Sequence, residues 1–442
     1  MDKNTLTQMT RRGFMRLTGA AAGVAAWGAL SDKVDPTQRI NAAPLNQKRL
    51  VVINLSGGND SLNMVIPRTV AEYQSRRTGL AIPAGQELAL SGNTSYGLHP
   101  KLVNIQSLYN AGDVAIVNKV GFPTPNLSHQ VAQDIYSYGV RGSFIPLSIP
   151  ISGWLARYAD AYAVGNPMGV ASIGFGKPLD FSGGVQTNFL VDSLSRFQFF
   201  SDPYFTNNHA YRINIIKSIL AANTSTGLVG NARAALDASH TLSVQVQAAV
   251  ADYVANFQVA YRWPGYPGTT ATPPGKAATS ISNRLRDISI LINGGFNTQV
   301  FYTGFGGFDT HAAQGQGTGA HATLMEQLDD AIGAFAADMQ AMGQWNNVAL
   351  VVITEFGRRN YVNGSAGTDH GHATAVMVIG GAVNGGVYGP DITSTDLQAE
   401  YLSMGVDFRY IYSQLVANHM GRATAPVFPE SFSAPGTPFT VI

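Results

Sequence analysis

Short apolar runs alternate with segments of helical periodicity over most of the chain beyond residue 48. Runs at 50–55, 114–117, 298–303, 348–353 and 375–379 have the length and composition of buried strands. Apolar residues recur at helical spacing in 102–110, 129–139, 208–260, 278–293, 321–342 and 408–419. Strands that alternate with helices in this way predict an α/β fold, a doubly wound, mostly parallel sheet sandwiched by helices.

One long stretch interrupts this alternation. Residues 140–205 are rich in Gly, Ser, Pro and Phe, and 261–276 are rich in Pro, Gly and Thr, which is typical of loops. We therefore expect one α/β domain over 44–442, with a loop-rich and helical insertion at about 140–295.

The N-terminus has the pattern of an export signal. Arg11 and Arg12 are followed by Phe14 and by a mildly apolar run at 17–30. This run is shorter than the roughly 20 apolar residues of a membrane span, so it is typical of a signal peptide. We predict a twin-arginine signal at 1–43, recognition by the twin-arginine export machinery, a periplasmic or extracellular location, and no stable membrane span after processing.

The number and balance of charged residues do not change the predicted fold. Of 442 residues 12% are charged, and 28 Lys and Arg face 27 Asp and Glu. The predicted signal carries six of these bases and three of the acids, so the remainder has a net charge of −2. Such a balance offers no basic footprint for nucleic acid. The chain has no Cys, which excludes disulfides, thiolate metal sites and cysteine nucleophiles.

Because charged residues are scarce, their positions are informative. Acidic and His side chains stand where predicted strands end or begin, at Asp60, Asp309, His311, Glu355, Asp369, His370 and His372. Ligands of open α/β sheets bind beyond the carboxyl ends of strands, so these side chains can converge. Carboxylate and imidazole together predict a divalent ion, in the first place zinc, with manganese, iron or calcium as alternatives, although calcium prefers fewer His. Taken singly, Asp60 has an alternative role as a helix cap and His311 as a surface residue.

The motifs GGNDSLN (57–63), GFDTH (307–311), TEFGR (354–358) and GTDHGHA (367–373) follow one another behind the twin-arginine pattern. As a set they resemble an uncharacterised, twin-arginine-exported bacterial family of the alkaline phosphatase and sulfatase superfamily. The resemblance implies an alkaline-phosphatase-like fold over about 50–421.

The resemblance also implies a set of metal ligands. Asp60 matches the first-strand ligand, Asp309 with His311 resembles an Asp–His pair, and Glu355 stands at a strand-end carboxylate. His370 and His372 match late His ligands, and Asp369 is either a ligand or the residue that orients His370. Because Asp309 and His311 are unusually close in sequence and Phe356 follows Glu355, the number of ions, one or two, stays open.

The nucleophile is the least defined part of the predicted site. Without Cys or a Ser-x-Pro-x-Arg sequence, a formylglycine is excluded, so an unmodified Ser or Thr or a metal hydroxide must act. Ser128 is the first candidate because it precedes a predicted helix, and His129 beside it is a second candidate catalytic residue; the alternative role of Ser128 is a plain N-cap. Thr124 and Ser61 are further candidates. Arg358, with Arg359 beside it, is a candidate clamp for substrate oxyanions; the alternative is that the two arginines are paired surface charges.

Two functions follow. In the first, the protein is an exported metal-dependent hydrolase of phosphate or sulfate esters, either small molecules or polymers. In the alternative, it is a non-catalytic exported protein that binds a glycan, a ligand or a partner on the same fold.

Overall fold

The structure is a computed structural model that describes residues 46–142, 152–186, 188–197, 209–222, 228–256 and 279–442. The predicted signal at 1–43 and the loop at 261–276 lie outside the described residues. In the part that is described, no helix combines the length and apolar character needed to cross a membrane.

A nine-stranded sheet forms the centre of the molecule, in the order β11-β5-β10-β9-β1-β8-β6-β7 with β12 beside β5. Every pair is parallel except those that β10 makes with β5 and β9. This arrangement confirms the predicted mostly parallel α/β sheet. The strands are β1 (Arg49–Ser56), β5 (Val114–Gly121), β6 (Val170–Ile173), β7 (Phe189–Val191), β8 (Val300–Gly306), β9 (Val348–Ile353), β10 (Thr374–Ile379), β11 (Gly386–Tyr388) and β12 (Val406–Asp407).

The reversed direction of β10 has a simple cause. Only an extended loop at 354–373, with no crossover helix, joins it to β9. A strand reached without a crossover begins at the edge where its neighbour ended, so it runs antiparallel. The start of β10 therefore lies at the carboxyl edge of the parallel strands.

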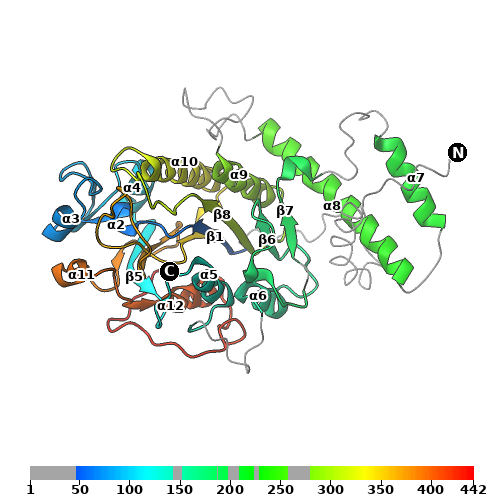
Figure 1. Cartoon of the computed structure of the whole chain (residues 1–442). Coiled ribbons are helices and arrows are strands. Elements are labelled where there is room, and N and C mark those ends of the chain that lie inside the picture. Colours follow the sequence, from blue (N-terminus) through cyan, green and yellow to red (C-terminus); the bar gives the residue numbers. More distant parts are fainter. Residues whose placement is uncertain (1–45, 143–151, 187, 198–208, 223–227, 257–278) are drawn as a thin grey trace.

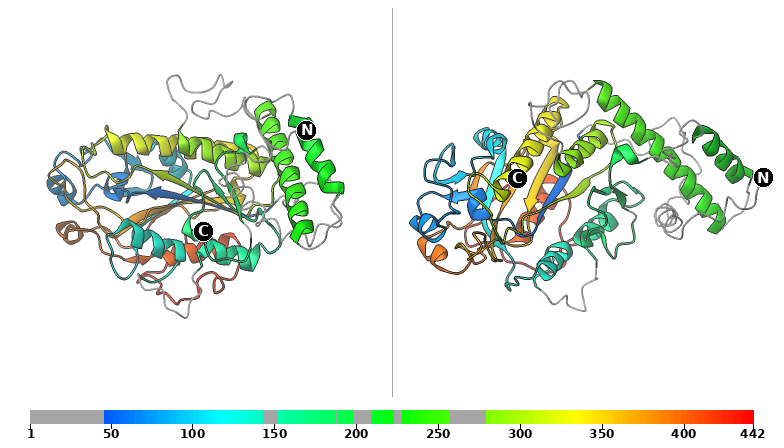
Figure 2. Two further views of the ribbon diagram at one scale, coloured as in Figure 1. Left: turned by 45° about the vertical axis from the view of Figure 1, so that its right-hand side comes forward. Right: turned by 45° about the horizontal axis from the view of Figure 1, so that its top comes forward.

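Helices cover both faces of the sheet (Figure 1). Along β1, Val51 and Ile53 face one core, while Leu50 and Val52 face the other, as the two-residue period of a strand requires. The first core is closed by α4 (Val103–Asn110), α9 (Ser280–Asn293) and α10 (Ala320–Ala341). The second is closed by α5 (His129–Tyr138), α6 (Trp154–Tyr162) and α12 (Phe408–Gln414), which continues as a π-helical turn, Leu415–His419. Figure 2 shows the same layers from two other sides.

The segment that we set apart as an insertion has two kinds of structure. β6 and β7 extend the main sheet beyond β8, and α6 packs on its second face. Two helices at α7 (His209–Ala222) and α8 (Leu228–Asn256) agree with the helical periodicity, and α8 packs against α9.

A small second sheet, in the order β2-β4-β3, was not expected from the sequence. Its strands are β2 (Val65–Pro67), β3 (Leu88–Leu90) and β4 (Asn93–Leu98), and the short helices α2 (Ser61–Met64), α3 (Ala71–Arg76) and α11 (Ser394–Gln398) complete the described helices. β2 and β3 have only three residues each, too few to show a period, so the pattern could not reveal this sheet.

Candidate metal centre

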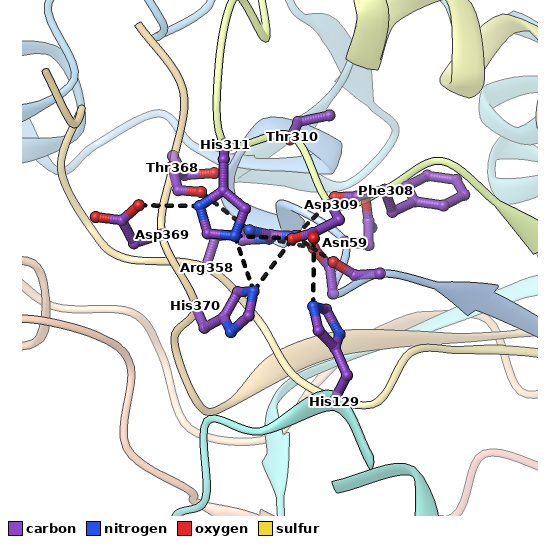
Figure 3. Close-up of polar contacts among 12 residues, drawn as sticks. Asn59, His129, Phe308, Asp309, Thr310, His311, Arg358, Thr368, Asp369 and His370 are labelled. Atoms are coloured by element: carbon purple, nitrogen blue, oxygen red, sulfur yellow. Dashed lines mark hydrogen bonds and ion pairs between the residues drawn. The ribbon is translucent and has the colours of Figure 1, made fainter. Parts of the chain in front are cut away.

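Five chain segments meet at the carboxyl edge of the sheet. They are the loops after β1, β5, β8 and β9, and the residues that lead into β10. Figure 3 shows the side chains that they bring together. This is the crevice where open α/β sheets bind ligands.

The Asp309 carboxylate lies at the centre of the group, with 45% of its side chain exposed. Its Oδ1 lies 3.0 Å from His311 Nε2 and 3.1 Å from His370 Nε2. His129 Nε2 lies 3.4 Å from Oδ2. The Nε2 atoms of His311 and His370 are themselves only 2.9 Å apart. Three imidazoles thus present the same ring nitrogen to one carboxylate (Figure 3).

The other ring nitrogen of each imidazole faces an oxygen. His129 Nδ1 lies 2.8 Å from Glu355 Oε1, and His370 Nδ1 lies 2.8 Å from the Leu127 carbonyl. His311 Nδ1 lies 3.0 Å from Asp369 Oδ1. Carbonyl and carboxylate oxygens only accept hydrogen bonds, so a proton on each Nδ1 would satisfy these three oxygens, and this is the tautomer that leaves Nε2 able to bind an ion.

With the proton on Nδ1, each of the three rings has a lone pair on Nε2, and all three Nε2 atoms lie near the Asp309 carboxylate. Burial is the main cause that lowers the pKa of His370 below its usual value, so at neutral pH this ring is uncharged. His129 Nε2 is buried and has no hydrogen-bond partner. Arg358 donates to Asp309, but the Nε2 lone pairs of His311 and His370 face each other, and a cation between them would relieve their repulsion. Histidines held through Nδ1 by carboxylate or carbonyl oxygens are typical of metal ligands.

The donor set therefore fits a divalent ion. His129, His370 and Asp309 bring donor atoms within 4.8 Å of one another, and His311 Nε2 lies at the edge of this group, next to Asp309 and His370. Imidazole nitrogen and carboxylate oxygen are the ligand types that zinc and other first-row divalent ions take. Calcium would require a shell made mostly of oxygen.

The Glu355 carboxylate is buried and accepts hydrogen bonds from several groups. Its Oε1 accepts from Gly57 N at 2.9 Å and from Gln133 Nε2 at 3.2 Å, besides the His129 ring. Thr354 Oγ1 donates to Oε2 at 3.1 Å. The sequence suggested Glu355 as a ligand; the structure places it behind His129, where it orients that ring.

Asp369 likewise lies behind a ring, but behind His311 and not behind His370 as we expected. Hydrogen bonds from Asn363, at 2.9 Å, and from His311 lower the pKa of Asp369. Both carboxylates behind the rings are thus positioned to hold a proton on Nδ1.

Arg358 departs from its expected role as a substrate clamp. Its side chain is fully buried and donates to the carbonyls of Gly57, Gly58, Phe308 and Thr368. Its remaining contact is Asp309 Oδ1 at 2.6 Å. Because the guanidinium donates its hydrogen bonds to groups of the protein itself, it links three loops and orients Asp309 instead of binding a substrate.

Of the neighbouring groups, Arg358 lowers the pKa of Asp309 the most. Burial alone raises the pKa of Asp309, but the Arg358 hydrogen bond and charge, followed by His370 and His311, lower it to about 2. The ligand carboxylate is therefore ionised throughout the neutral range.

Two expected ligands lie apart from this group. Asp60 is buried, pairs with Arg77 and accepts from Gln314 Nε2 at 2.5 Å. His372 is buried against Phe122, with ring centroids 5.0 Å apart, and burial lowers its pKa to about 4. His372 therefore contacts the core beside β5 and not the group around Asp309.

The candidate nucleophiles differ in access. Ser128 is exposed at the N-cap of α5 and makes no side-chain capping hydrogen bond, contrary to a plain cap. It stands between Leu127 and His129, which both contact the centre. Thr124 is exposed in the same loop, whereas Ser61 is buried in α2.

Sequence reasoning missed the supporting residues Gln133, Asn363 and Gln314 and the Leu127 carbonyl. Amide side chains and main-chain oxygens have no motif of their own, so the only available signal was their nearness in sequence to the acidic and His residues.

No curated protein matches the chain significantly by sequence. In structure the chain is similar to a protein of the alkaline phosphatase superfamily from Vibrio parahaemolyticus, with 11% identity, a TM-score of 0.37, and coverage of 94% of this chain and 79% of that one. It is also similar to the C-terminal periplasmic domain of EcEptC from Escherichia coli, with 9% identity, a TM-score of 0.37, and coverage of 91% and 95%. A third similar structure is the PsFucS1 sulfatase from Pseudoalteromonas sp., with 10% identity, a TM-score of 0.31, and coverage of 92% and 72%.

Scores of this size describe a partial likeness of fold and say nothing about the function of this chain. In sequence, residues 281–417 match the model of the family described as "Protein of unknown function (DUF1501)", and this confirms the resemblance to an uncharacterised family.

Proposed function

We propose that this protein is an exported, metal-dependent hydrolase of phosphate or sulfate esters. One observation carries the proposal: three imidazoles, each with Nδ1 held by an oxygen, direct Nε2 at a single ionised carboxylate. His129, His311, His370 and Asp309 would hold a divalent ion, most simply zinc. When bound, such an ion polarises the ester oxygen and stabilises the negative charge that develops in hydrolysis.

The protein's own residues provide a rigid and open site. Glu355, Asp369 and the Leu127 carbonyl hold the protons on the rings, and Arg358 keeps Asp309 in place. Phe356 packs on the rings of His129 and His370, with centroids 4.9 and 4.8 Å away, which limits their rotation. The exposure of Asp309 leaves one side of the group open to a substrate.

Ser128 is the nucleophile that we favour, and a water molecule is the alternative. Its hydroxyl is exposed beside His129 at the N-terminus of α5, where free backbone N–H groups stabilise negative charge. A Ser128→Ala variant separates the two. It would retain metal and lose hydrolysis if the hydroxyl attacks, and it would retain both if water does.

The experiment that tests the proposal uses full-length protein exported in folded form. We expect one or two zinc, manganese or iron ions per chain, and turnover of an aryl phosphate or an aryl sulfate that a chelator removes and the same ion restores. A native, well-folded protein that neither contains nor takes up a divalent ion would overturn the proposal. Metal uptake with no turnover of either ester would instead support the non-catalytic binding function.

The twin-arginine pattern at Arg11 and Arg12 supports export, and therefore a periplasmic or extracellular substrate. The twin-arginine route carries folded proteins, so the metal centre would be assembled before export.

A further inference from the structure

The buried side-chain amide of Gln314 contacts two of the loops that form the candidate metal centre. Gln314 is completely buried and uses both ends of its side chain. Its Oε1 accepts from the hydroxyls of Thr310 and Thr368, each at 2.8 Å. Its Nε2 donates to Asp60 Oδ2 at 2.5 Å.

The two threonines belong to the two loops that carry most of the donor atoms. Thr310 separates Asp309 from His311, and Thr368 directly precedes Asp369 and His370. A main-chain hydrogen bond from Thr368 N to Thr310 O, 3.1 Å long, joins the same two positions. One amide oxygen therefore sets the register of both loops.

The orientation of the amide is itself determined. Asp60 accepts from Gln314 on one side, and on the other it pairs with Arg77, whose side chain is also completely buried. A carboxylate accepts only, so it must face the amide nitrogen, and the oxygen must face the two hydroxyls. This contact gives Asp60 a role although it lies outside the group of donor atoms.

We propose that Gln314 is a positioning residue, which holds the loops of Asp309–His311 and Asp369–His370 at the spacing that a divalent ion requires. The inference rests on the proposed metal-dependent function. It adds that the affinity for the ion depends on Asp60, Gln314 and the two threonines, which hold the loops and do not bind the ion themselves. Partners behind the ligands typically change metal affinity about 10- to 100-fold when they are removed.

The test compares Gln314→Met with a matched control, Gln414→Met, in the full chain. Gln414 is also a buried glutamine; its amide bonds the Phe439 carbonyl and the Val441 N–H, far from the centre in sequence. We expect the dissociation constant for zinc alone, measured against a chelating dye, to rise about 10- to 100-fold in Gln314→Met and to stay unchanged in Gln414→Met. Adding Thr310→Val to Gln314→Met should weaken binding no further, because the two changes remove the same link.

A second measurement does not depend on the ion. Hydrogen exchange at the Thr368 amide should become faster in Gln314→Met and not in Gln414→Met, because the loops lose their common anchor. Wild-type zinc affinity in Gln314→Met, together with unchanged exchange at Thr368, would overturn the inference. If the wild type itself binds no divalent ion, the proposed function fails, and Thr368 exchange alone decides whether Gln314 positions the loops.

Discussion

Asp309 gathers three histidines and one arginine around a carboxylate that is nearly half exposed. Residue types and their place at strand ends were sufficient to predict Asp309, His311 and His370 as members of one group. Their division into ligands and supports could not be predicted, because it depends on which ring nitrogen meets which oxygen in space.

The two histidines of the GTDHGHA motif provide the sharpest test at this scale. His370→Ala should remove the bound ion, since it deletes one of four donors. His372→Gln should retain the ion, since its ring packs against Phe122 and contacts none of the donor residues. Metal content per folded chain, measured for both variants, checks this. Loss of the ion in His372→Gln alone would show that the ligands are assigned wrongly.

Arg358 allows a different test, because a role in binding the substrate and a role in linking the loops predict different results. Arg358→Lys keeps the charge but cannot reach four carbonyls and a carboxylate at once. We expect a loss of about 3 kcal/mol or more in the free energy of unfolding, together with loss of the ion. Urea unfolding and metal analysis measure both. An unchanged stability with a raised KM for the ester would restore the role as a substrate clamp.

At the scale of elements, the site depends on how closely loops approach one another. Gly57 ends β1 with φ of 118°, and a Cβ built there would lie 2.5 Å from Asp309 N. Only glycine permits the loop after β1 to lie against the loop after β8. Gly57 N also donates to Glu355, so the approach links three loops.

Gly57→Ala should therefore destabilise the protein by more than the roughly 1–2 kcal/mol that a positive φ alone costs, and it should displace Asp309. Gly79→Ala is the matched control. Gly79 has φ of 82° but open space around its Cβ position. Thermal unfolding and metal content of the two variants separate backbone strain from the collision. Equal losses in both would mean that the close approach has no energetic role.

For the whole molecule, buried histidines control stability in acid. His419 is buried, its Nε2 lies 2.9 Å from the Arg49 carbonyl, and burial lowers its pKa to about 4. The unfolded chain binds this proton near pH 6.5 and the folded chain only near 4, so the contribution of His419 to stability is lost as the pH falls from about 6.5 to 4.

His419→Gln should remove this dependence while its amide replaces the hydrogen bond to Arg49. Near pH 5, the slope of the unfolding free energy against pH should fall by about 1.4 kcal/mol per pH unit, the value for one proton. Denaturant unfolding at several pH values between 4 and 7 measures the slope. The same slope in wild type and variant would show that His419 is protonated in the folded protein.

The sequence alone determined the alternation of strands and helices, since a buried strand and an amphipathic helix each have a local period that tertiary contacts only reinforce. It also determined that any metal ligands must be His or carboxylate, because the chain has no Cys. Tertiary structure decided the rest. Asp60, Arg358 and His372 stand in the same set of motifs as the donor residues, but Asp60 pairs with Arg77, Arg358 supports Asp309 from within the protein, and His372 packs against Phe122. These contacts join segments that only the folded chain brings together, which no local pattern encodes.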